Sequence, residues 1–292
     1  MTSIRTDLAL EAHALWKESA GETTDLPGVA AREEELYGFS LTRVEILDRE
    51  GEEALGKPRG VYCTLEVPNL RGSGVLPRAA RAAADLLEPL LPEEGPVLVC
   101  GLGNAAMTPD ALGPCTLDHL LVTRHLGEAL PDLRPVAALA GGVLGTTGLE
   151  AAEWVRGAAE RVGPAAIIVI DALAARELKR LCTTVQISDT GLVPGSGVGN
   201  HRMALNRESL GIPVLSVGVP TVVHAVTVAR DILSAAGCGE SLPQELQAAG
   251  PLFVTPDAID QKIRDLAKLL GYALRLALQP GLDLEDLEEL LR

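Results

Sequence analysis

Aromatic residues are almost missing from this chain, which has two Trp, three Tyr and two Phe among its 292 residues. The sequence is nevertheless 47% hydrophobic, so a sizeable core is available. Leu, Val, Ile and Ala must build that core, which suits a parallel sheet covered by helices. Because the sequence has no internal repeat and no low-complexity linker, we predict a single domain over residues 1–292.

Basic residues are outnumbered, with 25 Lys and Arg against 40 Asp and Glu, which gives a formal net charge of −15. No basic stripe offsets phosphate repulsion, which argues against nucleic acid as a direct ligand. No apolar run reaches the length of a transmembrane helix, and residues 1–16 are too polar and charged for a signal peptide. We therefore expect no direct nucleic-acid partner, no membrane association and a cytoplasmic location.

The sequence motifs of several common hydrolases and metal sites are absent. The five cysteines are odd in number and include no CxxC pair, so neither a disulfide framework nor a zinc finger is indicated. The five histidines form no HExxH motif, and no GxSxG elbow is present, which disfavours zinc peptidases of that type and serine hydrolases. We therefore expect no resident metal and no cofactor.

Apolar runs without alternation predict the core strands of the sheet. The clearest run, residues 165–170 (AAIIVI), follows Gly163-Pro164 and has the pattern of a strand buried on both faces of a parallel sheet. Further core strands are predicted at 96–100, 136–140, 183–187 and 213–219, and alternation predicts an antiparallel pair at 41–47 and 60–67. Helices are predicted at 6–20, 77–91, 112–130, 149–162, 172–181, 221–236, 256–278 and 282–291. The fold class is therefore α/β, a mainly parallel twisted sheet flanked by helices, with a small antiparallel β addition.

Two acidic residues, Asp110 and Asp171, each lie just past a predicted core strand. Parallel strands that both end in acids can bring the two carboxylates together at one edge of the sheet. Such a pair can divide into one acid and one base, because close like charges resist joint ionisation. It can also hold a metal ion, and the plainest alternative is two unrelated loop acids that cap helices.

Glycine-rich stretches give three further candidates. Gly101 to Ala106 fits the G-x-G-x-x-A turn of dinucleotide sites, but Pro109 stands where the phosphate-binding helix should run. A nucleotide-binding sensor is the non-enzymatic hypothesis that this turn supports. Asp189-Thr190-Gly191 matches the tripeptide of pepsin-like proteases, although a second copy is absent. The loop over residues 191–200 can bring its backbone close to a ligand, and we assign Gly195, Ser196 and Gly197 to substrate binding.

Four segments together resemble the germination protease family of spore-forming bacteria. They are Arg5-Thr6-Asp7-Leu8-Ala9, residues 108–114 (TPDALGP), residues 170–176 (IDALAAR) and residues 186–200 (QISDTGLVPGSGVGN). The resemblance implies an endopeptidase that degrades small acid-soluble spore proteins in the spore core during germination. It also implies an atypical aspartic protease with catalytic residues Asp110 and Asp171, a homotetramer made as a zymogen, and a fold related to hydrogenase maturation proteases, whose corresponding positions bind metal.

Two departures from the family pattern qualify these expectations. Only residues 1–4 precede Arg5, whereas the family usually carries a longer acidic propeptide, so we expect activity without a long maturation step. Residues 104–107 (NAAM) lack the bulkier polar or aromatic residues expected before Thr108. The predicted function is an endopeptidase with an Asp110/Asp171 dyad that activates water, and the alternative is a metal-dependent peptidase with the same aspartates as ligands.

Overall fold

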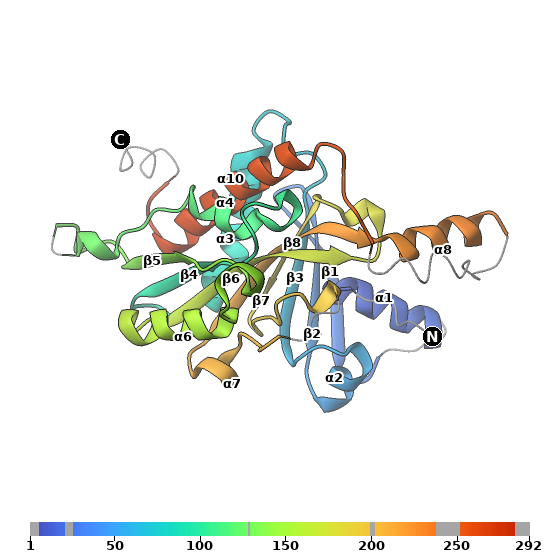
Figure 1. Ribbon diagram of the computed structural model, residues 1–292, viewed down its shortest axis with the longest axis horizontal. Coiled ribbons are helices and arrows are strands. Elements are labelled where there is room, and N and C mark those ends of the chain that lie inside the picture. Colours follow the sequence, from blue (N-terminus) through green and yellow to red (C-terminus); the bar gives the residue numbers. More distant parts are fainter. Residues whose placement is uncertain (1–5, 21–25, 128, 199–201, 238–251, 284–292) are drawn as a thin grey trace.

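A nine-stranded mixed sheet forms the centre of the computed structural model, which describes residues 6–20, 26–127, 129–198, 202–237 and 252–283 (Figure 1). The strand order is β1-β2-β3-β7-β8-β6-β4-β5, and β9 pairs with β8. The strands are β1 (Val29–Leu36), β2 (Phe39–Ile46), β3 (Gly60–Glu66), β4 (Val97–Gly101), β5 (Val136–Ala140), β6 (Ala166–Ala175), β7 (Thr184–Ser188), β8 (Val214–His224) and β9 (Phe253–Val254). The predicted α/β fold class and all the predicted strands are confirmed.

The sheet has a parallel part and an antiparallel part. Strands β5, β4, β6 and β8 pair in parallel, whereas β7, β3, β2 and β1 continue the sheet in antiparallel pairs. The antiparallel part is therefore larger than the small addition that we predicted. Strand β1 was not predicted, because its residues VAAREEEL are mostly exposed and carry the charges typical of an edge strand.

Helices cover both faces of the parallel part (Figure 1). The helices are α1 (Ala9–Ala20), α2 (Arg49–Leu55), α3 (Val75–Leu87), α4 (Leu112–Leu117), α5 (Leu144–Thr147), α6 (Ala151–Val162), α7 (Arg207–Leu210), α8 (Ala225–Ala235) and α10 (Ile259–Leu278). Val99, Ile168 and Ile170 pack on the side of α3 and α10, whereas Leu98 and Ile167 pack on the side of α6. No helix in the described part of the chain combines the length and apolar character needed to cross a membrane.

The predicted helix over residues 172–181 is wrong, and the one over 221–236 begins later than predicted, as α8, because the long pairing of β6 with β8 overrides local composition. Strand β6 continues to Ala175 instead of ending at Ile170, and β8 continues to His224 beyond the predicted start of the helix at Thr221. The four residues after Asp171 have helical propensity, but each pairs with a residue of β8. Propensity is a weak preference that tertiary pairing can override, so only η4 (Leu178–Arg180) remains helical in the predicted segment 172–181.

The predicted helix over residues 112–130 is also too long. Helix α4 ends at Leu117, and the chain then turns back toward the sheet. The Thr123 N–H donates to the carbonyl of Val136 at 3.1 Å, and the Thr123 hydroxyl accepts from the Val136 N–H at 2.9 Å. The chain must leave the helix to make these bonds. The predicted helix at 282–291 lies outside the described residues except for its first two.

Gly113 allows α4 to begin directly against the end of β4 and the middle of β6. A Cβ there would lie 2.3 Å from the carbonyl oxygen of Leu102 and 2.7 Å from that of Ile170. We predict that Gly113→Ala lowers the free energy of unfolding by about 1–3 kcal/mol, because backbone must shift to admit the methyl group. Denaturant unfolding measures the change.

Gly157 in α6 provides the matched control, because a Cβ at this exposed helical position meets nothing within 4 Å. Gly157→Ala should be neutral or stabilise the chain by up to about 1 kcal/mol, since alanine restricts the unfolded state. Equal stability of the two variants would contradict the close packing at Gly113.

Candidate active site

Asp171 is a carboxylate in the interior of a buried strand. Strand β6 is otherwise apolar, and Asp171 is 7% exposed. Strand β4 pairs with β6 only as far as Gly101 opposite Ile170, whereas Asp171 pairs with Gly218 of β8 on the other side. The N–H of Ala172 donates to the Asp171 Oδ1 atom at 3.0 Å. Asp171 therefore lies where β6 loses one neighbour and a cavity can begin.

Asp110 reaches the same place from the loop that follows β4. The loop folds back at Gly103, where φ is +103° and a Cβ would lie 2.0 Å from the Asp110 carbonyl oxygen. The N–H of Asn104 then donates to Asp110 Oδ2 at 2.8 Å. The loop leads into the short 3-10 helix η2 (Thr108–Asp110), not into the helix that a dinucleotide site needs. The turn at Gly103 thus allows the loop that carries Asp110 to fold back on itself.

Both aspartates line one cavity of about 340 Å³, and each influences the charge state of the site. Burial raises the pKa of Asp171 well above its usual range, and the negative charges of Asp110 and Asp7 raise it further. Burial also raises the pKa of Asp110, although the Asn104 N–H and the Arg202 charge oppose that effect. Two carboxylates that resist joint ionisation can provide one acid and one base.

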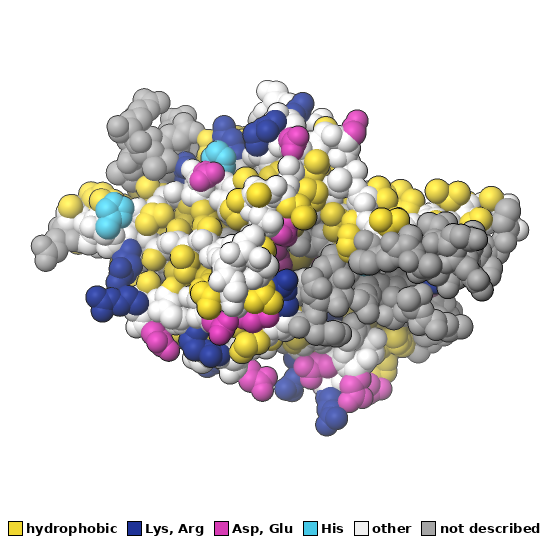
Figure 2. All heavy atoms as spheres, in the orientation of Figure 1, with side chains coloured by type: hydrophobic (Ala, Val, Ile, Leu, Met, Phe, Trp, Pro, Cys, Tyr) yellow, Lys and Arg dark blue, Asp and Glu magenta, His cyan; other side chains and the backbone are white. Residues whose placement is uncertain are grey.

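The cavity wall is largely apolar, which strengthens these electrostatic effects because little water can screen the charges. On the face shown in Figure 2, hydrophobic side chains gather around the centre of the molecule, with acidic side chains visible between them. The apolar residues that line the cavity include Leu102, Met107, Val143, Leu144, Val222 and Phe253.

Asp7 is a third carboxylate at the site, and our sequence reasoning did not assign it a role. Its Oδ2 atom accepts a hydrogen bond from the Ala174 N–H at 2.8 Å, and its Oδ1 atom accepts one from the Ser196 hydroxyl at 2.8 Å. The Asp7 N–H donates to the Ala174 carbonyl at 3.0 Å. The only sequence signal for Asp7 was its place in the family motif at residues 5–9.

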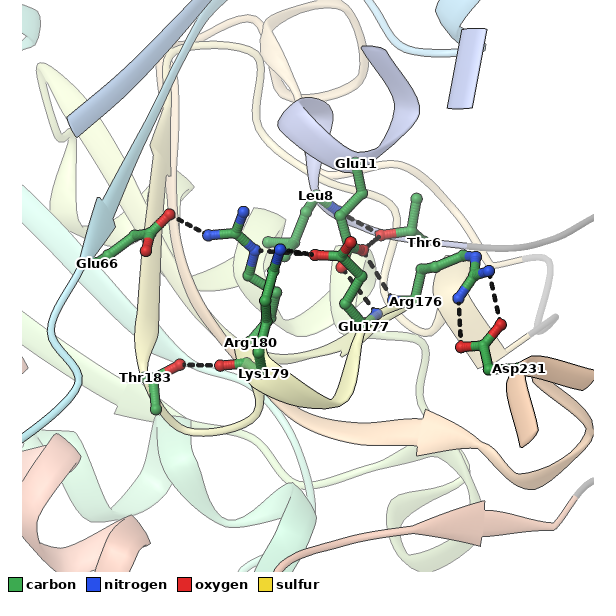
Figure 3. A network of polar contacts seen from close by, with 10 residues as sticks. All are labelled: Thr6, Leu8, Glu11, Glu66, Arg176, Glu177, Lys179, Arg180, Thr183 and Asp231. Carbon is green, nitrogen blue, oxygen red and sulfur yellow. Dashed lines mark hydrogen bonds and ion pairs between the residues drawn. The ribbon is translucent and has the colours of Figure 1, made fainter. Parts of the chain in front are cut away.

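A polar network fixes the segment that carries Asp7 (Figure 3). The buried carboxylate of Glu11 accepts hydrogen bonds from the Thr6 hydroxyl and from the N–H groups of Arg176 and Glu177, the latter two at 2.7 and 2.9 Å. Burial raises the pKa of Glu11, and these hydrogen bonds oppose that rise. The Nζ atom of Lys57 also donates to the Asp7 carbonyl at 2.9 Å. The start of α1 is thereby attached to the end of β6.

The glycine-rich loop lies beside the aspartates, as far as it is described. Gly195 lines the cavity with both catalytic candidates, and Ser196 holds the Asp7 carboxylate. The carbonyl of Gly197 lies 3.1 Å from Nε2 of His224. Residues 199–201 lie outside the described part of the chain, and the assignment of Gly195, Ser196 and Gly197 to substrate binding stays a prediction.

Two other charged residues, Arg202 and Asp189, have different roles in the structure. Arg202 lines the cavity, and its charge lowers the pKa of both Asp110 and Asp171 against the stronger effect of burial. Our sequence reasoning missed it. Asp189, from the pepsin-like tripeptide, accepts a hydrogen bond from the Val61 N–H at 2.8 Å and so joins β7 to β3. It therefore has a structural role in this fold.

The described residues do not fit a resident metal ion. Within the ranges that the structure describes, no group of three or more His, Cys, Asp or Glu side chains is placed to hold one. The carboxylates of Asp7, Asp110 and Asp171 line one cavity, but they do not come together as ligands of one ion.

The α/β fold brings the carboxyls of Asp110 and Asp171 to one cavity, and comparison with known proteins gives the family of the chain. The family model described as germination protease matches residues 9–236. A germination protease of Caldanaerobacter subterraneus subsp. tengcongensis is 45% identical over an alignment of 322 residues that covers 99% of this chain and 98% of the relative. One from Clostridium perfringens is 40% identical over 326 residues and covers both chains completely. The chain belongs to the germination protease family and is a protease.

A solved structure also shows similarity to the chain. It is the [NiFe] hydrogenase maturation protease HycI from Thermococcus kodakarensis KOD1, with 19% sequence identity and a TM-score of 0.37. The match covers 65% of this chain and 99% of that chain.

The buried charge of Asp171 should make the wild type less stable than an uncharged variant at neutral pH. Because its pKa is higher in the folded chain than in the unfolded chain, the stability that it contributes is present at low pH and is lost as pH rises. We predict that Asp171→Asn has a higher Tm than the wild type at pH 7, and that this difference shrinks as the pH falls to the usual range of Asp.

Thermal melting over a pH series measures this difference. The control Asp132→Asn, at an exposed position, should leave Tm unchanged at each pH. A lower Tm for Asp171→Asn than for the wild type at pH 7 would show that the ionised carboxylate stabilises the fold.

Gly197 tests the glycine loop, because a Cβ there would lie 2.1 Å from Asp7 Oδ2 and 2.8 Å from the Cβ of Ala174. We predict that Gly197→Val reduces cleavage while the fold stays intact, since the valine displaces the loop or Asp7 from the cavity. Peptide turnover and thermal melting are measured together. Unchanged turnover at unchanged Tm would remove this loop from the site.

Proposed function

We propose that the chain is an endopeptidase that initiates the degradation of small acid-soluble spore proteins during spore germination, with Asp110 and Asp171 as the catalytic dyad. The observation that carries the proposal is the meeting of these two partly or fully buried carboxylates in one cavity, where Asp110 raises the pKa of Asp171. Membership of the germination protease family supports the choice of substrate.

The different surroundings of the two aspartates suggest their roles. Asp171 is the more buried residue, so it holds a proton and polarises the carbonyl oxygen of the scissile peptide bond. Asp110 has the Asn104 N–H and the Arg202 charge beside it, which favour the ionised form that accepts a proton from water. That water attacks the carbonyl carbon, and the proton then passes to the leaving nitrogen. The two groups titrate as a coupled pair.

The edge of β6 supports a polypeptide as the substrate. Beyond the end of β4, Ala172 lines the cavity. Farther along the strand, Asp7 already pairs with Ala174, because the Asp7 N–H donates to the Ala174 carbonyl as a neighbouring strand would. An extended peptide can add to such an edge through main-chain hydrogen bonds. The scissile bond would then lie beside the Asp171 carboxylate.

We predict that Asp110→Asn and Asp171→Asn each lower cleavage by about 10²- to 10⁴-fold, because either change removes one protonation role. The assay is incubation with purified small acid-soluble spore proteins and mass spectrometry of the fragments. The control Asp118→Asn, at an exposed position at the end of α4, should cleave at the wild-type rate. Thermal melting shows whether each variant is folded.

Chelation separates the dyad from the alternative, a metal-dependent peptidase with the same aspartates as ligands. Prolonged chelator treatment should leave the wild type active. If chelation abolishes cleavage and a divalent metal restores it, the dyad is wrong and the metal-dependent peptidase replaces it. If the wild type cleaves none of the spore proteins, the proposed substrate is wrong.

Family membership also supports proposals on assembly, activation and location. We infer a homotetramer that is made as a zymogen and acts in the spore core. Light scattering measures the assembly, and an intact-mass time course shows which residues, if any, are removed before activity appears. Activity of the unprocessed chain would contradict the zymogen.

A further inference from the structure

Strand β8 contains one residue more than β6 where the two pair beyond Asp171. Leu173 pairs with Pro220 and Ala174 pairs with Val222, so Thr221 is the extra residue of a β-bulge. Bulges are frequent next to active sites, where they re-aim a side chain. Thr221 is 1% exposed, which means that its re-aimed side chain points into the protein and needs a hydrogen-bond partner there.

The partner of Thr221 belongs to the loop that carries Asp110. The Thr221 hydroxyl donates to the carbonyl oxygen of Pro109, the residue before Asp110, at 2.7 Å. The carbonyl of Thr221 accepts a hydrogen bond from the Thr255 hydroxyl at 2.9 Å, so the bulge itself is held from the other side. Thr221 and Pro109 both line the cavity that contains the aspartates. One buried hydroxyl thus connects β8 to the residue next to a catalytic candidate.

The other hydrogen bonds of this loop set its shape but not its position. The N–H of Asp110 donates to the Met107 carbonyl, the N–H of Ala111 donates to the Thr108 carbonyl, and Asn104 holds the Asp110 carboxylate. All of these bonds are internal to residues 104–111. Among the described residues, Thr221 supplies the hydrogen bond that reaches this segment from another strand.

We propose that Thr221 is a positioning residue, which holds Asp110 at the separation from Asp171 that the dyad requires. The proposal rests on the proposed function of the two aspartates. The bulge places the hydroxyl, the hydroxyl fixes Pro109, and Pro109 fixes the next residue along the chain. Because β8 also pairs with β6 at Asp171, one strand sets the position of both carboxylates.

The test compares three variants of the full chain in the cleavage assay. Thr221→Val keeps the branched shape and removes the hydroxyl, and we expect kcat to fall by about 10- to 100-fold with little change in KM, because small misplacements of a catalytic group are costly. Thr221→Ser restores the hydroxyl and should restore most of the activity. The control is Thr64→Val, because Thr64 is 0% exposed and its hydroxyl has no hydrogen-bond partner among the residues that the structure describes.

The pH profile distinguishes positioning from a general structural role. Asp171 is surrounded by Asp110, Asp7 and Arg202, and the Asp110 charge raises its pKa. If Asp110 moves away in Thr221→Val, the pKa of Asp171 falls and the alkaline limb of the kcat profile shifts to lower pH. Loss of packing alone would lower Tm without this shift.

Each outcome bears on one proposal. A Thr221→Val variant with wild-type kcat, an unshifted alkaline limb, or a Thr221→Ser variant as impaired as Thr221→Val would overturn the positioning role. If Asp110→Asn itself cleaves normally, the proposed dyad fails instead. An inactive Asp110→Asn beside a fully active Thr221→Val would leave the dyad standing and remove only Thr221.

Discussion

The pairing of β6 with β8 is the constraint on which the site depends. Because β8 runs to His224, β6 stays extended five residues past Ile170, although β4 has already ended opposite that residue. Asp171 is thereby held in the interior of a strand, buried on one side by β8 and open to a cavity on the other. An ionised carboxylate is costly to bury, and the packing of the sheet gives no reason for one here. The proposed chemistry at the cavity gives this position a reason to be acidic.

Three distant segments bring carboxylates to this cavity, and each carboxylate has a backbone N–H as a partner. Asp171 is held by Ala172, Asp110 by Asn104 and Asp7 by Ala174. Hydrogen bonds from N–H groups favour the ionised form and partly offset the mutual repulsion.

The arrangement also depends on close approach of the backbone, since Gly103 and Gly113 leave no room for a side chain. Backbone hydrogen bonds and close backbone contacts therefore set the positions of the three carboxylates.

The sequence was sufficient to predict the elements whose signal is local. The apolar runs of β4, β5 and β6 identified the parallel strands, and the rule that ligands gather at the carboxyl edge of such a sheet led to Asp110 and Asp171. Asp7, Arg202 and Thr221 escaped prediction because their partners are far away in the chain: Asp7 bonds to Ala174 and Thr221 bonds to Pro109. The false helix after Asp171 has the same origin, since alanine-rich composition is local and the pairing with β8 is not.

The two aspartates lie on different kinds of structural element, and this difference affects their relative pKa values. Asp171 belongs to a strand inside the core, whereas Asp110 lies on the short helix η2, which contacts β6, β8 and α10. Equal surroundings would leave the proton shared evenly between the carboxylates. Here the deeper burial of Asp171 favours the proton on that residue, whereas Arg202 lowers the pKa of both carboxyls and does not separate them. Separation of the pKa values of two neighbouring carboxyls is what the proposed acid and base require, and the deeper burial of Asp171 on its strand acts in that direction.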